Sequence, residues 1–106
     1  MLHVLERDRW ETVGDAYRPA SLDSEGFIHF ATTGSVLAVA QYDHSDADEP
    51  VLLAVDTAEL DAEVRYEETP SGAFPHVYGP IERDAVVDVL DFPREDGRYV
   101  LPEALR

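Results

Sequence analysis

Three of the four histidines in the sequence lie inside short apolar stretches that end at turn-forming residues. His3 lies in the stretch LHVL, His29 in GFIHF and His76 in FPHVYGP. An imidazole among apolar neighbours is costly to bury unless its nitrogens find hydrogen-bond partners. Because binding and catalytic groups gather where strands end beside loops, we predict that these three histidines converge on one cleft.

Further polar residues are predicted to contribute to the same cleft. We expect Tyr78 there, together with at least one of Arg18, Ser21 and Glu67. Tyr78 can supply a hydroxyl from the FPHVYGP stretch, whereas Glu67 ends the alternating stretch EVRYE. Arg18 and Ser21 lie just upstream of the GFIHF stretch. The alternative is that these groups only satisfy one another's hydrogen bonds across neighbouring strands.

The spacing of the histidines does not favour a metal site. Neutral imidazoles with one carboxylate can hold zinc or iron. However, no two histidines here show the i, i+2 or i, i+4 spacing of compact metal motifs, so no metal is expected. A G-x-S-x-G nucleophile motif and a glycine-rich phosphate loop are also absent from the sequence, which argues against a serine hydrolase and a P-loop enzyme.

The elements that must position these residues are mostly short strands. Residues 6–13 and 33–42 are predicted to form two short helices, because their apolar residues recur at helical spacing. The apolar or alternating stretches predict strands over residues 2–5, 27–30, 51–55, 63–67, 76–78, 84–92 and 98–101. Early helices followed by many strands indicate an α+β fold, and we expect residues 1–106 to form a single domain.

The charge is strongly acidic. The formal net charge is −15, from 23 acidic and 8 basic residues, and all the basic residues are arginine. Such a chain repels phosphate backbones and anionic lipids, so neither nucleic-acid nor membrane binding is expected. The sequence has no cysteine, and its first residues do not form the apolar core of a signal peptide. We therefore expect a cytoplasmic protein, with any protein partner unknown.

Several of these stretches together resemble a known bacterial family. They are LHV with His3, RPASLDSEGFIHFATT, LLAVD, VRYE and FPHVYGPI. In this combination the chain resembles the domain-of-unknown-function family numbered 952, which is grouped with the ADP-ribosyltransferase fold. The resemblance implies a split, curved, mostly antiparallel sheet with two short helices. Similarity to the NAD-binding strands of RNA 2′-phosphotransferases implies NAD or ADP-ribose as the ligand and NAD as the substrate.

The resemblance also implies roles for the candidate residues. His3 and His29 would orient the ribose and the amide of NAD, and Glu67 would stabilise the positive charge that develops on the ribose. Tyr78, or Phe27 if it faces the cleft, would stack on the nicotinamide, and Arg18 would bind the pyrophosphate. The family comparison thus predicts an ADP-ribosyl or phosphoryl transferase. The alternative is a catalytically silent module of the same fold that binds a small ligand or a protein.

Overall fold

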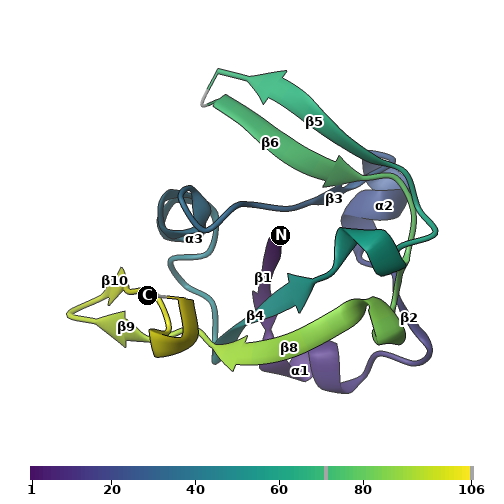
Figure 1. The fold of residues 1–106 in the computed structure, drawn as a ribbon. Helices are drawn as coiled ribbons and strands as arrows, with labels where there is room; N and C mark the ends of the chain where they lie inside the picture. The colour runs from purple at the N-terminus through teal and green to yellow at the C-terminus, as the bar shows by residue number, and fades with distance from the viewer. Residues whose placement is uncertain (71, 106) are drawn as a thin grey trace.

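The computed structural model describes residues 1–70 and 72–105, with Asp43 described by its backbone only. Its fold is α+β with mostly antiparallel sheets and a few short helices, as the sequence predicts (Figure 1). In chain order the elements are β1 (Leu2–Glu6), α1 (Arg7–Glu11), β2 (Ala16–Tyr17), α2 (Ala20–Ser24), β3 (Ile28–His29), α3 (Val36–Asp43), β4 (Pro50–Val55), η1 (Thr57–Glu59), β5 (Val64–Thr69), β6 (Gly72–Val77), β7 (Ile81–Glu82), η2 (Arg83–Ala85), β8 (Val86–Asp91), β9 (Arg94–Glu95), β10 (Arg98–Tyr99) and η3 (Glu103–Leu105).

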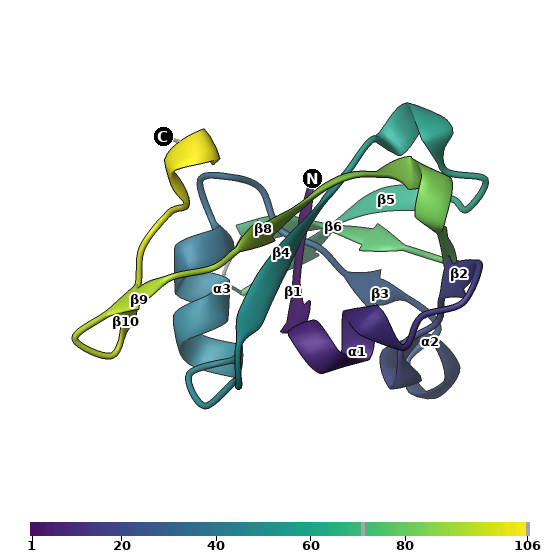
Figure 2. The ribbon, with the colours of Figure 1, turned by 90° about the horizontal axis from the view of Figure 1, so that it is seen from below.

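Two three-stranded antiparallel sheets form the body of the structure. One has the order β1-β4-β8 and the other β3-β6-β5. They are linked by an isolated antiparallel bridge between Leu2 and Ala31, whose two backbone hydrogen bonds are each 2.8 Å long. Figure 1 shows the β5–β6 hairpin on one side of the N-terminus and β4 and β8 on the other, and Figure 2 shows β1, β4 and β8 beside one another.

The first sheet is covered on both faces, which explains why the central strand β4 is apolar at every position. Leu53 and Val55 belong to a core cluster shared with the second sheet, where Ile28 and Val77 are also buried. Leu52 belongs to the other cluster, which packs beneath α3. The alternation of side chains along a strand thus divides β4 between two cores.

The helices differ from the prediction. Three α-helices lie in the described ranges rather than two, because residues 20–24, which were not predicted to be helical, form α2. The helix predicted over residues 6–13 is confined to Arg7–Glu11. Gly26, just after α2, has φ +86°, a backbone conformation that glycine adopts readily. Among residues 1–70 and 72–105, no helix combines the length and apolar character that crossing a membrane requires.

The second sheet explains why β6 is longer than predicted. The strand begins at Gly72 and continues through Pro75. Phe30 donates its N–H to the Pro75 carbonyl at 3.0 Å. Because proline has no N–H, Pro75 cannot return a hydrogen bond to Phe30, and the paired part of β3 ends at His29. The proline therefore sets the end of β3 without interrupting β6.

Candidate functional site

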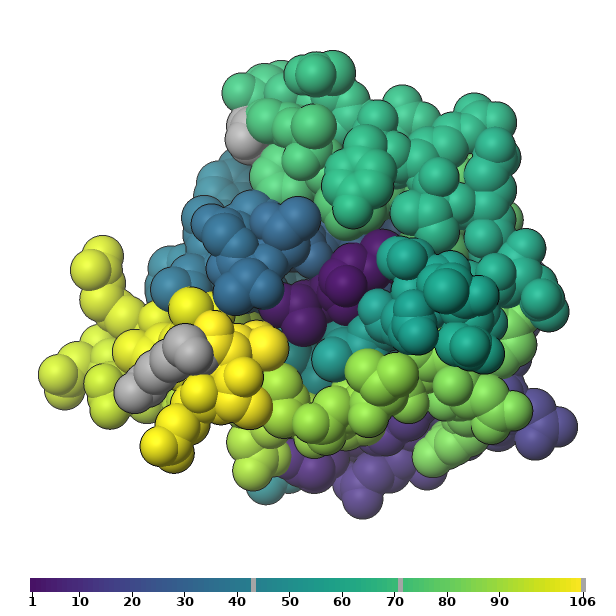
Figure 3. Space-filling model, in the orientation of Figure 1, coloured from purple at the N-terminus to yellow at the C-terminus, as the bar shows by residue number. Residues whose placement is uncertain are grey.

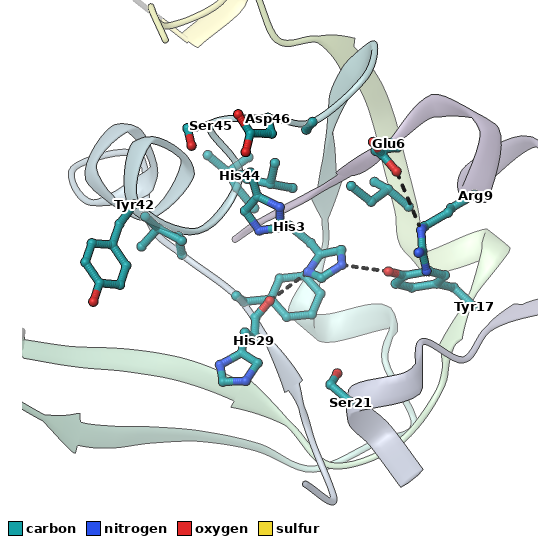
Figure 4. A pocket seen from close by; sticks show the side chains of 17 residues that line it. His3, Glu6, Arg9, Tyr17, Ser21, His29, Tyr42, His44, Ser45 and Asp46 are labelled. Atoms are coloured by element: carbon teal, nitrogen blue, oxygen red, sulfur yellow. Dashed lines mark hydrogen bonds and ion pairs between the residues drawn. The ribbon is translucent and has the colours of Figure 1, made fainter. Parts of the chain in front are cut away.

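A large hollow lies beside β1. It has a volume of about 830 Å³, within the usual range of small-molecule sites. Its walls come from β1, α1, β2, α2, β3, α3 and the segment between α3 and β4 (Figure 4). The polar side chains around it belong to His3, Glu6, Arg9, Tyr17, Ser21, His29, Tyr42, His44, Ser45 and Asp46. We call this hollow the His3 pocket.

His3 is positioned by its place in β1. Leu2 and Val4 point into the core beneath α3, so His3 points to the opposite face, towards the second sheet. There its ring lies 5.2 Å from the ring of Phe30, measured between centroids. The alternation of β1 therefore places an imidazole where an apolar residue would otherwise complete the core.

Both ring nitrogens of His3 have partners. Nδ1 lies 2.7 Å from the backbone carbonyl oxygen of His29, and Nε2 lies 2.8 Å from the hydroxyl of Tyr17. Because a carbonyl oxygen can only accept, Nδ1 carries the proton. Burial disfavours the imidazolium and lowers the pKa of His3 to about 4, so at neutral pH Nε2 accepts from the tyrosine O–H.

This chain of hydrogen bonds fixes the chemistry of Tyr17. Burial raises the pKa of Tyr17 to about 12, so the hydroxyl stays protonated, and its one proton is donated to His3. The hydroxyl oxygen keeps its lone pairs and can accept a hydrogen bond from a ligand. The pocket thus presents a fixed acceptor, suited to a ligand hydroxyl or amide N–H.

Charged groups lie at the rim of the pocket. Arg9 has a largely exposed side chain, and its Nε lies 3.8 Å from Glu6 Oε1. Glu6 Oε2 accepts the backbone N–H of Asp48 at 2.8 Å. Glu6 is therefore held by two partners, whereas the guanidinium nitrogens of Arg9 beyond Nε remain suited to an anionic ligand group.

The predicted site residues are divided between two places. Ser21 lines the His3 pocket, and so does His29, although its imidazole points away from His3 (Figure 4). That imidazole lies instead beside Glu25, with Nε2 to Oε2 at 3.2 Å. Arg18 pairs with Asp23 at 3.6 Å and is not among the residues that line the pocket.

His76, Tyr78 and Glu67 lie on the outer face of the second sheet. The ring of His76 stacks on Phe27, with centroids 4.1 Å apart and an interplanar angle of 11°. The Tyr78 hydroxyl donates to Glu67 Oε1 at 3.0 Å. The structure therefore brings His29, His76, Tyr78 and Glu67 to one face, and leaves the His3 imidazole on the other side of the sheet.

His76 is the least satisfied of these groups. It is only 8% exposed, and within the described part of the chain Nδ1 has no hydrogen-bond partner. Burial, and secondly the nearby His29, lower its pKa. Among residues 1–70 and 72–105, no three His, Asp or Glu side chains are arranged to hold a metal ion.

Comparison of the sequence with known protein families identifies the family of this chain. The sequence profile of DUF952, described as a protein of unknown function, matches residues 4–89. The chain belongs to this family. DUF952 accounts for most of both sheets, whereas β9, β10 and η3 lie beyond the matched residues. No curated protein matches the chain.

Solved structures of another protein share this DUF952 fold. The chain is similar to the crystal structure of CC0527 from Caulobacter crescentus, with a TM-score of 0.87 and 26% identity over 98% of this chain and 96% of that one. The solution NMR structure of CC0527 gives a TM-score of 0.73 with 25% identity, over 92% and 88% of the two chains. Both likenesses extend across nearly the whole DUF952 fold.

The predicted site residues did not include seven of the ten polar residues of the pocket in this DUF952 chain, namely Glu6, Arg9, Tyr17, Tyr42, His44, Ser45 and Asp46. Tyr17 is buried in β2, a strand of two residues that pairs with β7. A two-residue strand carries no periodic signal, which explains why the predicted strands do not include Tyr17. The signal that could have found it is chemical: a buried tyrosine needs a partner for its hydroxyl, and His3 needed one for Nε2.

Proposed function

We propose that the chain binds a small ribose-bearing ligand, NAD or ADP-ribose, in the His3 pocket, as a member of the ADP-ribosyltransferase-like group. The observation that carries the proposal is the hydrogen-bond chain from Tyr17 through His3 to the His29 carbonyl. It offers a ligand hydroxyl or carboxamide N–H one fixed, neutral acceptor in a hollow of about 830 Å³.

The charges at the rim support a ligand with a diphosphate. Arg9 lines the pocket, whereas Arg18, to which the family resemblance assigned the pyrophosphate, pairs with Asp23 elsewhere. A local guanidinium is needed because the chain as a whole carries −15 and repels anions. We therefore assign the diphosphate contact to Arg9.

The arrangement favours a binding module over a transferase. A transferase of the predicted kind needs its carboxylate and its ribose-orienting histidine at one pocket. Here Glu67 accepts from Tyr78 on the outer face of the second sheet, and it is not among the residues that line the His3 pocket. His3 itself, with a pKa of about 4, is neutral at neutral pH, and its one ring proton is donated to the His29 carbonyl, so Nε2 has no proton to donate as a general acid.

The test is thermal unfolding with NAD, ADP-ribose or nicotinamide. A ligand at about 100 times its dissociation constant stabilises a fold by about 3 kcal/mol, which raises the melting temperature by several degrees. Tyr17→Phe and Arg9→Ala are expected to reduce the shift, and Tyr66→Phe, outside the pocket, to retain it. No shift with either NAD or ADP-ribose at millimolar concentration contradicts the proposal. Release of nicotinamide from NAD would contradict the catalytically silent binding module and favour the transferase instead.

A further inference from the structure

The outer edge of β5 is an unpaired strand edge. β5 pairs with β6, and no other described strand pairs with it. Tyr78 donates its N–H to the Glu63 carbonyl at 2.9 Å, which sets the alternation of the ladder. Arg65 and Glu67 therefore direct their backbone groups towards β6. The N–H and C=O groups of Val64, Tyr66 and Glu68 point away from β6, where a further strand could bind them.

The Leu2–Ala31 bridge joins the two three-stranded sheets, and β8 lies at the opposite end from β5. The outer edge of β8 is protected from pairing with a further strand. In β8, Val89 directs its backbone away from β4, but its N–H donates to the Asp88 carboxylate at 2.9 Å. Asp91, the next outward residue, forms an ion pair with Arg7. An edge that carries charged side chains, and whose outward N–H groups bond to side chains of the same strand, discourages the addition of a further strand. No hydrogen bond of this kind is seen at Val64, Tyr66 or Glu68 in the described structure.

We propose that two copies of the chain associate through this edge, with β5 antiparallel to the partner's β5 and Tyr66 opposite the partner's Tyr66. Tyr66 is 64% exposed, one of the most exposed large apolar side chains of the described residues. In the pair, the outward backbone groups of both strands satisfy each other, and the two tyrosine rings cover one another.

Charge favours this register over the two neighbouring hydrogen-bonding registers. With Tyr66 at the centre, Arg65 lies opposite the partner's Glu67, and Glu67 opposite the partner's Arg65. These are the non-hydrogen-bonded positions, where facing side chains are closest. Moving the centre one residue to Arg65 places two arginines opposite each other, and moving it to Glu67 places two glutamates there. Both neighbouring registers are disfavoured by like charges.

Arg65 and Glu67 each have side-chain atoms that can form these contacts with the partner. The Arg65 side chain is 57% exposed and contacts Glu63 through Nη2 at 3.0 Å, so its other nitrogens can reach a carboxylate. Glu67 uses Oε1 for Tyr78 and retains Oε2. The long-range repulsion between two copies at −15 each is screened beyond about 8 Å at physiological salt, whereas facing pairs in contact are screened much less.

Mass measurements with charge-reversed variants test the register. Sedimentation equilibrium is expected to show the mass rising with protein concentration from 11.8 kDa towards twice that value, and the association to strengthen from low to physiological salt. Arg65→Glu and Glu67→Arg each place like charges opposite each other and are expected to weaken association about tenfold or more. The double variant restores opposite charges and is expected to recover it. A wild-type chain that stays monomeric, or a double variant no better than the single ones, overturns the proposal.

Crosslinking provides a second test that does not depend on charge. The chain has no cysteine, so a single introduced thiol reports one position. Facing hydrogen-bonded residues have Cα atoms about 5.5 Å apart, within the range of a disulfide. Oxidised Tyr66→Cys is expected to form a covalent dimer, whereas Val87→Cys on β8, 65% exposed in the wild type, is expected to remain largely monomeric. Equal crosslinking of the two variants overturns the proposal, and circular dichroism checks that each is folded.

Discussion

His29 and His76 lie opposite each other in the register of β3 and β6, with ring centroids 5.4 Å apart. Their environments differ despite this pairing. His29 is exposed and lies beside Glu25, whereas His76 is 8% exposed and stacks on Phe27. A charge on His76 would be both desolvated and close to a second imidazole, so the neutral form of His76 is favoured.

Replacing His76 with Phe is expected to stabilise the fold. The phenyl ring keeps the stacking on Phe27 and removes Nδ1, which has no hydrogen-bond partner in the described structure. An unsatisfied buried polar group costs about 1 to 3 kcal/mol, so we expect the free energy of unfolding to rise by about 1 kcal/mol. Urea unfolding measures it, with His29→Phe at the exposed neighbouring position as the control. A loss of stability in His76→Phe would mean that Nδ1 has a partner, such as a bound water.

The stability of the fold is expected to depend on the protonation of His3 in acid. Its pKa is about 4 in the folded state against 6.5 for an unperturbed histidine, so between these values the unfolded chain binds the additional proton. Stability from this group is therefore present above pH 6.5 and is lost as the pH falls towards 4, by roughly 2 to 3 kcal/mol.

His3→Gln, which does not titrate, isolates that contribution. Urea unfolding at a series of pH values is expected to show a shallower loss between pH 6.5 and 4 in the variant than in the wild type. His44→Gln, at another histidine that lines the pocket, serves as the comparison. Parallel profiles for the wild type and His3→Gln would show that His3 titrates normally in the folded protein.

Gly79 is expected to tolerate no side chain. A Cβ at this position would lie 2.7 Å from the Cβ of Ala62, closer than packed carbon atoms allow. Gly79→Ala is therefore expected to lose about 1 to 3 kcal/mol of stability, as other overpacked sites do. Gly14→Ala, where nothing lies within 4 Å, is the matched control. Adding Ala62→Gly to Gly79→Ala removes the facing methyl group and is expected to recover most of the loss; no recovery would place the clash elsewhere.

Leu53 is expected to be among the most sensitive apolar positions. It is fully buried in the core between the two sheets. Leu53→Ala removes packed methyl groups and leaves a cavity, at a cost of about 2 to 5 kcal/mol. Val87→Ala, at a residue 65% exposed, is expected to change stability by less than about 0.5 kcal/mol. Similar losses from the two variants in urea would contradict the assignment of the core.

The sequence predicted the elements whose signals are local and strong. The run VLLAV indicated a buried strand and forms most of β4. The alternation of EVRYE predicted β5, where Arg65 is exposed and Val64 packs against the core. Hydrophobic periodicity determines such strands because each residue's face follows from its position.

The site was predicted less well, because it depends on which side of a sheet each residue faces. His3 and His76 both lie in apolar strands, yet their imidazoles end on different sides of the second sheet. That outcome is set by the Leu2–Ala31 bridge and by the β3–β6 register, which are contacts between distant parts of the chain. Tyr17 depends on a third such contact, the pairing of β2 with β7. A single sequence does not encode these pairings locally.

The bridge between Leu2 and Ala31 also makes the two sheets mechanically dependent on each other. Leu2 lines the His3 pocket and also a second hollow of about 490 Å³, in which Figure 3 shows the N-terminal residues. Amide hydrogen exchange at Leu2 and Ala31, compared with Leu53, measures how readily this joint opens. Because Leu2 lines both hollows, any displacement of this joint changes the shape of the two hollows together.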